Sequence, residues 1–128
     1  MIEGIPARLY PPVRHRCLPF LENFVARSMG RWTVEDLEND VLDSSRQLWR
    51  IGDFQALAMT ALDAENVIID AAAGVRRHEW QDELDRTLRE WGKALGKRRI
   101  IAFVRRGWEP FGRSRGYRVS HVEMTVDL

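Results

Sequence analysis

The stretch VIIDAAAGVRRHEWQDELDRTLREWGKALGKRRIIAFV, residues 67–104, decides the fold. A strand, a helix and a second strand follow one another along it, at residues 67–72, 79–95 and 99–104. The two strands are apolar and bounded by turn residues, as buried strands are. Elements in this order form a βαβ unit, which predicts two parallel strands joined by a right-handed crossover.

The crossover helix carries one apolar stripe. Its apolar residues recur at helical spacing, which is typical of a helix that packs one face on a sheet. These residues are Trp80, Leu84, Leu88, Trp91 and Leu95. On the other face, the pairs Asp82–Arg86 and Asp85–Arg89 have i,i+4 spacing, so we expect them to form ion pairs in contact with water.

Two helices are predicted ahead of the sheet. The first covers residues 11–29 and should break or kink near Pro19, because proline cannot donate the backbone hydrogen bond of a helix interior. Thr33 and Asp36 have the spacing of a capping box. This signal predicts that a second helix starts after Thr33 and ends at about residues 43–45.

Short strands account for the rest of the sheet. They are expected at residues 47–51, 54–62, 67–72, 99–104 and 117–126. Gly52 and Asp53 form a natural hairpin turn, so the first two of these strands should be antiparallel. The glycine-rich residues 107–116 predict a loop or short helix before the final strand, which is indicated by alternating apolar residues.

The order of elements indicates an α/β (α+β) fold. It predicts a central mixed, mostly antiparallel sheet of about five strands with helices on both faces. The 128 residues are 45% hydrophobic and 30% charged, which suits one globular domain over residues 1–128. No linker, repeat or low-complexity tract divides the chain.

Composition excludes several classes of protein. No apolar run reaches the ~20 residues that cross a bilayer, and residues 1–6 lack the basic start and apolar core of a signal peptide. We therefore expect no membrane partner and no secretion by that route. Cys17 is the single cysteine, so no internal disulfide forms, and no Cys/His spacing predicts a metal site.

Arginine dominates the basic residues. Eighteen of the 20 cations are arginine, and most lie in the C-terminal half, yet the net charge is only +1. Arginine favours fixed, forked contacts with phosphate or carboxylate groups. Without a recognisable nucleic-acid motif, however, we interpret most of these side chains as a solvated surface, and nucleic acid is the least favoured partner.

Several short sequence motifs narrow the class of protein further. Together with the order of elements, they resemble the GNAT superfamily of acyl-CoA N-acyltransferases, with the first strand of that fold missing or irregular. Within it they are similar to a group of small GNAT-like proteins that phages and prophages encode, often among their virion genes. The resemblance covers about residues 30–126. The short motifs that carry the resemblance lie at residues 30–36, 47–49, 91–96, 105–108 and 115–117.

The resemblance implies a loop that would hold the pyrophosphate of acetyl-CoA at the start of the crossover helix. In the family this loop usually reads Q/R-x-x-G-x-G/A, and its backbone amides bind the phosphates. Here Glu79 and Gln81 stand where the two small residues belong, and a carboxylate there would repel phosphate. The candidate cofactor-binding residues are Gly74, Val75, Arg76, Arg77 and His78.

The resemblance also implies a proton acceptor and a proton donor. Asp70 is the candidate catalytic base, and its alternative interpretation is an ordinary carboxylate at a solvent-facing or edge position; Glu109 and Glu123 are weaker candidates. The family's donor is usually a tyrosine. At the matching position this chain has Gly112, with Phe111 beside it, and neither side chain carries a transferable proton.

Two functions stay open on the sequence alone. In the first, the chain is a GNAT-fold accessory or virion-associated structural protein that needs no cofactor, performs little or no acyl transfer and acts in the host cytoplasm or the virion. Its partner would be a phage structural protein or a second copy of the chain. In the second, it is an active N-acetyltransferase that uses acetyl-CoA on an unknown amine.

The two functions predict different geometry. A sheet splayed beside an open helix start would favour acetyl-CoA binding. The same notch filled by Arg77, Glu79 or Trp80 would favour the protein without transferase activity. Trp108, in the glycine-rich segment, is the tryptophan expected at a cleft or an interface.

Overall fold

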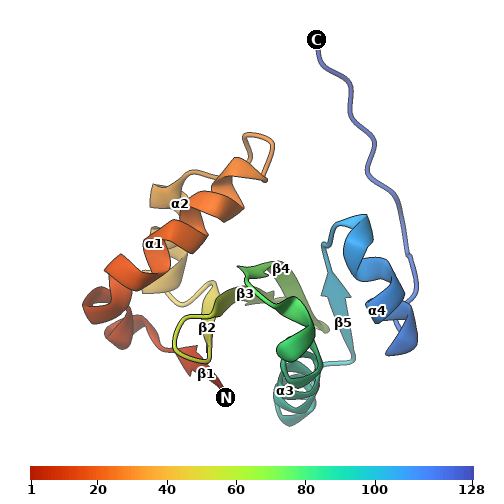
Figure 1. Ribbon diagram of the computed structural model, residues 1–128, viewed down its shortest axis with the longest axis horizontal. Helices are drawn as coiled ribbons and strands as arrows, with labels where there is room; N and C mark the ends of the chain where they lie inside the picture. Colours follow the sequence, from red (N-terminus) through yellow and green to blue (C-terminus); the bar gives the residue numbers. More distant parts are fainter.

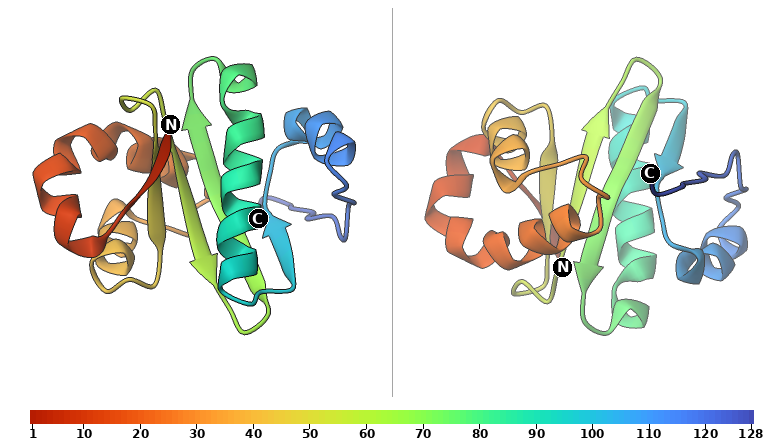
Figure 2. Two further views of the ribbon diagram at one scale, coloured as in Figure 1. Left: turned by 90° about the horizontal axis from the view of Figure 1, so that it is seen from below. Right: turned by 90° about the horizontal axis from the view of Figure 1, so that it is seen from above.

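The computed structural model describes all of residues 1–128 and contains a five-stranded sheet in the order β1-β2-β3-β4-β5. Helices α1 and α2 cover one face and α3 covers the other (Figures 1 and 2). The strands are β1 (Ile2–Ile5), β2 (Gln47–Ile51), β3 (Ala56–Leu62), β4 (Asn66–Gly74) and β5 (Arg99–Ala102). The helices are α1 (Tyr10–Ala26), α2 (Val34–Leu42), α3 (Gln81–Ala94) and α4 (Glu109–Ser114), with short 3₁₀ turns η1 (Ala7–Leu9), η2 (Arg77–Glu79) and η3 (Arg106–Trp108).

The predicted fold class is confirmed. Strands β1 to β4 form an antiparallel meander. Strand β5 then pairs parallel to β4 after the crossover through α3. The sheet is therefore mixed and mostly antiparallel, with helices on both faces, and the stretch at residues 67–104 supplies its only parallel pair.

Two hydrophobic clusters lie on opposite faces of the sheet. One joins α1 and α2 to the sheet, and Leu37 and Leu48 are fully buried in it. The other lies under α3, where the rings of Trp49 and Trp91 meet edge to face with centroids 4.9 Å apart. Of the predicted stripe, Trp80, Leu84 and Leu88 are buried there and Trp91 is partly buried, whereas Leu95 is 47% exposed just past the helix end.

The capping box of α2 forms as the sequence predicts. The Thr33 hydroxyl accepts a hydrogen bond from the Asp36 amide (3.1 Å), and the Asp36 carboxylate accepts one from the Thr33 amide (3.0 Å). Of the predicted break or kink near Pro19, the break is wrong, because α1 continues past this residue. No helix is both long and apolar enough to cross a membrane.

The amino-terminal part of the sheet differs from expectation in two places. A first strand does exist: β1 pairs with β2 from Ile2 opposite Ile51 to Ile5 opposite Leu48. Four residues are too few to show a periodic pattern, so this strand could not be predicted from periodicity. Strand β3 starts later than predicted because Phe54 has a φ of 56° and belongs to the turn.

The predicted final strand at residues 117–126 is wrong. The chain beyond Tyr117 pairs with no strand and runs away from the body (Figure 1). Tyr117 itself is held on α3, where its hydroxyl donates to Asp85 (2.8 Å). Asp85 also accepts a hydrogen bond from Arg89 (2.9 Å) and is only 7% exposed. The expectation that this ion pair lies in contact with water is therefore wrong for Asp85. Alternating apolar and polar residues indicate a segment that can form a strand, but the strand also needs the edge of a sheet to pair with.

Candidate functional site

The sheet opens between β4 and β5. Their pairing runs from Asn66 opposite Arg99 to Ile69 opposite Ala102, although β4 continues to Gly74. The last backbone hydrogen bond between them goes from the Phe103 amide to the Ile69 carbonyl (3.1 Å). Beyond it the strands part at their carboxyl ends, which is where open α/β sheets bind ligands. We call this opening the splay; the loops after β4 and after β5 flank it.

Gly74 sets the position of the first flanking loop. A Cβ at this position would lie 2.3 Å from the Cβ of Ala56 and 2.5 Å from the carbonyl oxygen of Gln55. Only glycine lets the end of β4 come so close to β3. The Val75 amide then donates to the same Gln55 carbonyl (3.2 Å), which fixes the start of the loop.

The loop presents backbone amides that have no acceptor. Arg76 adopts a left-handed conformation (φ 51°, ψ 52°), and the amides of Arg76, Arg77 and His78 make no hydrogen bond within the protein. Consecutive free amides near the start of a helix suit an anion. Of the five residues predicted to bind a cofactor, these three supply such groups, whereas the Val75 amide is already used.

Glu79 lies at the start of the crossover helix, as the sequence predicts, and carries a charge there. Its carboxylate accepts hydrogen bonds from Gln55 and from Arg76, both at 2.9 Å. These hydrogen bonds, that from Gln55 first, lower the pKa of the carboxyl below its ordinary value. An anion at the loop would therefore meet a carboxylate that is already paired with one of the two arginines.

A side-chain bridge crosses the splay. The guanidinium of Arg77, after β4, lies 4.4 Å from the ring centroid of Trp108, after β5, and donates to the Gly107 carbonyl oxygen (3.1 Å). The Trp108 ring packs in turn against Trp80, with centroids 5.9 Å apart. Trp80 belongs to the core, being 3% exposed, and its indole donates to the Val75 carbonyl (2.9 Å). Arg77 and Trp108 therefore occupy the space between the flanking loops.

Asp70, the candidate base, lies in a bulge of β4 and is only 11% exposed. It accepts a hydrogen bond from Arg46, whose guanidinium also donates to Asp40 (2.9 Å) and lies 4.9 Å from the ring centroid of Trp32. Burial raises the pKa of the Asp70 carboxyl, and the charge of Arg46 opposes that shift. The carboxylate is thus a partner in a partly buried ion pair and not a solvent-facing group.

The remaining candidate groups are also engaged. Glu109 pairs with Arg113, and Glu123 pairs with Arg31. The chain has two tyrosines: the hydroxyl of Tyr117 donates to Asp85, and that of Tyr10 donates to Glu38 (2.6 Å). Burial raises the pKa of both hydroxyls, so neither releases its proton readily.

The short helix α4 carries no proton donor at the position that the resemblance indicates. Gly112 and Phe111 lie there, and a Cβ on Gly112 would make only an ordinary contact with Tyr117, at 3.5 Å. Two open cavities lie elsewhere. The larger, of about 300 Å³, lies between α1 and α2 and is lined in part by Tyr10, Arg14 and Glu38.

Sequence reasoning missed two features of this region. Arg46, the partner of Asp70, stands 24 residues away with no motif to connect them. The bridge from Arg77 to the segment of Trp108 spans 30 residues and depends on the parallel pairing of β4 and β5. The prediction that Trp108 lies at a cleft or an interface was the one available signal, and the structure places this ring against Arg77 beside the splay.

No family model matches the sequence, and no curated protein matches it either. Several solved structures share its fold. A ribosomal-protein-alanine N-acetyltransferase from Brucella melitensis biovar Abortus 2308 has a TM-score of 0.70 at 10% identity, over 100% of this chain and 98% of that one. The aminoglycoside N-acetyltransferase AAC(6')-Iy, in complex with CoA, has a TM-score of 0.68 at 10% identity, over 100% and 98%.

A mutant protein from Bacillus halodurans reaches 17% identity with a TM-score of 0.66, over 100% of this chain and 99% of that one. At such identities the likeness concerns the fold and not the reaction. The sheet order, the splay and the crossover through α3 agree with that likeness. The chain therefore has the fold of the GNAT acetyltransferases.

Proposed function

We propose that this chain is a GNAT-fold accessory protein that performs little or no acyl transfer and acts by contact with another protein. The observation that carries the proposal is the bridge between Arg77 and Trp108. CoA bound in the manner that the fold implies would run between the loops that flank the splay. In this chain a cation–π contact and a hydrogen bond join those loops instead.

The residues present fit acetyl-CoA only in part. The free amides of Arg76, Arg77 and His78 suit its phosphates. The space beyond them is occupied by the Arg77 and Trp108 side chains, and separating a cation from an aromatic face costs about 0.5–2 kcal/mol before the lost hydrogen bond is counted. The phosphate end therefore fits and the thioester arm does not.

The side chains available for proton transfer support the same proposal. A transferase must take a proton from the amine, and the leaving thiolate must receive one. Asp70 is bound to Arg46, and both tyrosine hydroxyls are bound to carboxylates. Gly112 occupies the position where the family has its donor. Asp70 and the two tyrosine hydroxyls would each have to break a hydrogen bond before transferring a proton.

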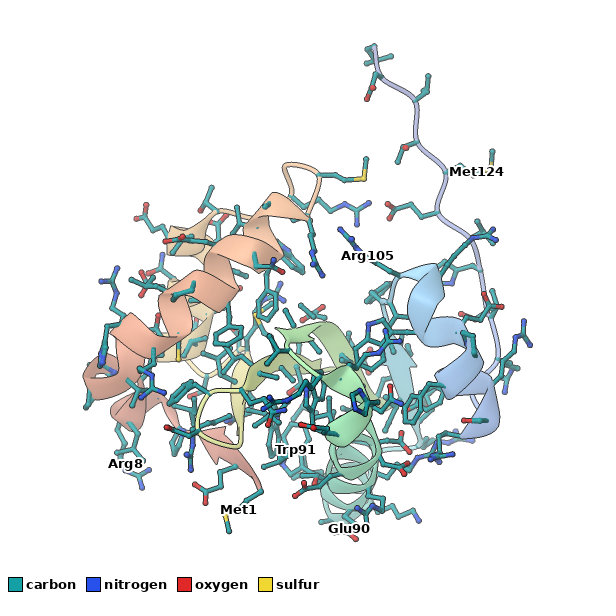
Figure 3. The ribbon with its side chains drawn as sticks, viewed as in Figure 1. Met1, Arg8, Glu90, Trp91, Arg105 and Met124 are labelled. Carbon is teal, nitrogen blue, oxygen red and sulfur yellow. The ribbon has the colours of Figure 1, made fainter.

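The proposed location and partner of the protein rest on the short sequence motifs. They resemble small GNAT-like proteins of phages and prophages, so we place the protein in the host cytoplasm or the virion, with a phage structural protein as the external partner. The arginines that face solvent without an acidic partner support protein contact. They include Arg99, Arg105 and Arg106, and Figure 3 labels Arg105 near α4.

A second candidate function is N-acetyl transfer from acetyl-CoA to an unknown amine. Two observations favour it: the free amides of the loop, and the raised pKa of Asp70, which makes this carboxylate a better base once Arg46 moves away. It requires the bridge at Trp108 to open. An assay of transfer separates the two functions directly.

Acyl transfer is tested by following the release of free CoA thiol from acetyl-CoA in the presence of amine mixtures and peptides. We expect no release above that of a protein-free blank. The Asp70→Asn variant is the matched control because it keeps the shape of the side chain and removes the base. Release that requires the protein and falls in Asp70→Asn would contradict the proposal and establish the second function.

A further inference from the structure

The cavity of about 300 Å³ between α1 and α2, which we call the α1–α2 groove, combines apolar walls with negative charge. Its apolar walls come from Tyr10, Pro11 and Leu42, and Leu42 is 50% exposed. The charge comes from α2 and its C-cap, because residues 34–43 hold five acidic residues and no basic one. A groove of this kind suits a side chain with an apolar stem and a cationic end.

Glu35 is the carboxylate of the groove that is left for an incoming cation. Its neighbour Glu38 is already satisfied, because Arg14 donates to both of its oxygens (2.5 and 3.0 Å) and Tyr10 donates to one of them (2.6 Å). Glu35 is exposed and forms no ion pair within the chain. Asn39 lines the groove one turn further along α2, so a second oxygen can accept a hydrogen bond there.

The loop after β5 exposes apolar and cationic side chains side by side. Phe103 and Val104 are 55% and 53% exposed, and Arg105 and Arg106 are exposed without an acidic partner. The ring of His121 lies 6.5 Å from that of Phe103 and leaves more than half of Phe103 uncovered. We call residues 103–106 the basic loop. Exposed aromatic and arginine side chains together are typical of a protein–protein interface.

The basic loop and the α1–α2 groove are complementary in both charge and polarity. The loop lies within residues 97–118, which hold eight of the 20 cations of the chain and a single acidic residue. When the loop docks in the groove, an arginine pairs with Glu35, and the apolar part of the loop covers the exposed side chain of Leu42. Attraction between opposite charges speeds such an encounter and disfavours other orientations.

The two surfaces lie far apart on one molecule. In both views of Figure 2, α1 and α2 are at one end and the end of β5 with α4 is at the other. The start of α1 follows β1, and β1 and β5 are the opposite edges of the sheet. The basic loop therefore cannot reach the groove of its own chain, whereas it is exposed to a groove on another molecule.

We propose that the basic loop of one copy of the chain docks in the α1–α2 groove of a second copy. The contact is head to tail, because each docking leaves a free groove on one copy and a free basic loop on the other. Copies joined in this way add further copies or close into a ring. The contact goes beyond the proposed function, since it does not depend on whether the chain transfers acyl groups.

The proposal is tested by the solution mass of the full chain, measured by light scattering over a range of concentrations at low salt. We expect a mass above the 14.9 kDa of one chain that rises with concentration and falls as salt screens the exposed charges. Glu35→Arg and the double variant Arg105→Gln, Arg106→Gln should each have the mass of one chain. Glu22→Arg and Arg86→Gln, which change exposed charges elsewhere, are the matched controls and should assemble as the wild type does.

A mixture of the groove variant and the loop variant identifies the two surfaces. One of them keeps the basic loop and the other keeps the groove, so an equal mixture should reach twice 14.9 kDa and grow no further. A mixture that stays at the mass of one chain would overturn the proposal. So would a wild type that stays at this mass at every concentration, or variants that assemble as the wild type does. Circular dichroism confirms that each variant is folded.

Discussion

The Gly74→Ala variant is expected to lose about 3 kcal/mol or more of its free energy of unfolding, a large share of the stability of a domain of this size. The added methyl group would lie 2.3 Å from the Cβ of Ala56 and 2.5 Å from the Gln55 carbonyl oxygen. Neither neighbour is a flexible side-chain end, so the end of β4 must move away from β3. Urea unfolding of the two proteins measures the difference.

Gly112→Ala is the matched control for this prediction. Its added Cβ would meet Tyr117 at 3.5 Å, an ordinary contact, and alanine favours the helix in which it lies. We expect its stability to stay within about 1 kcal/mol of the wild type. Equal stability of Gly74→Ala and Gly112→Ala would contradict the close approach of β4 to β3 on which the position of the loop depends.

The Arg46→Met variant is expected to be less stable than the wild type by about 3 kcal/mol at neutral pH. Methionine keeps much of the side-chain volume but leaves the Asp70 carboxylate, 11% exposed, without its partner. A charge buried in this way is far less favourable than the ion pair it came from. Arg50→Met, which breaks an exposed pair with Glu3, is the matched control and should cost less than about 1 kcal/mol.

The stability deficit of Arg46→Met should depend on pH. Burial and the nearby Asp40 both raise the pKa of Asp70, and Arg46 is the group that lowers it. Without Arg46 the folded-state pKa lies further above the unfolded value, so the folded protein binds the proton more tightly. The destabilisation is then absent below the unfolded pKa, near 3.8, and grows as pH rises through the folded pKa.

Urea unfolding at neutral and acid pH measures this dependence. The additional change Asp70→Asn, which removes the charge, should restore part of the lost stability at neutral pH. A deficit in Arg46→Met that is the same at both pH values would mean that Arg46 contributes by packing on Trp32 and not by its charge.

The sequence could predict the elements that carry a strong periodic or local signal. The stripe of α3 and the capping box at Thr33 are complete within a few turns of the chain, so both were predictable. Strand β2 has the predicted bounds because turn residues flank it on both sides. Strand β1 was not predictable, since its four residues show no pattern and owe their conformation to pairing with β2.

Residues 117–126 show the limit of periodicity. Their alternation predicts a strand, yet none forms there, because a strand also depends on pairing with a neighbouring strand. Asp85 shows a related limit: i,i+4 spacing predicts its pairing with Arg89 but not its burial, which follows from the packing of Tyr117 on α3.

The location of the candidate site was predictable from the sequence, but the contacts that its side chains make were not. The loop at residues 74–78 could be placed at the end of β4 from the resemblance and from the glycine. The contact between Arg77 and Trp108 beside the splay joins residues that only the folded topology brings together. The same holds for the pairing of Asp70 with Arg46.

The most direct test of this account is the thermal melting of the wild-type protein with and without millimolar acetyl-CoA. A ligand at ~100 times its dissociation constant adds about 2.7 kcal/mol to the free energy of unfolding, which raises the Tm of such a domain by about 10 °C. We proposed above that Arg77 and Trp108 close the splay, so we expect no saturable rise in Tm. A saturable rise of several degrees would contradict the proposed closure and show that the chain binds acetyl-CoA.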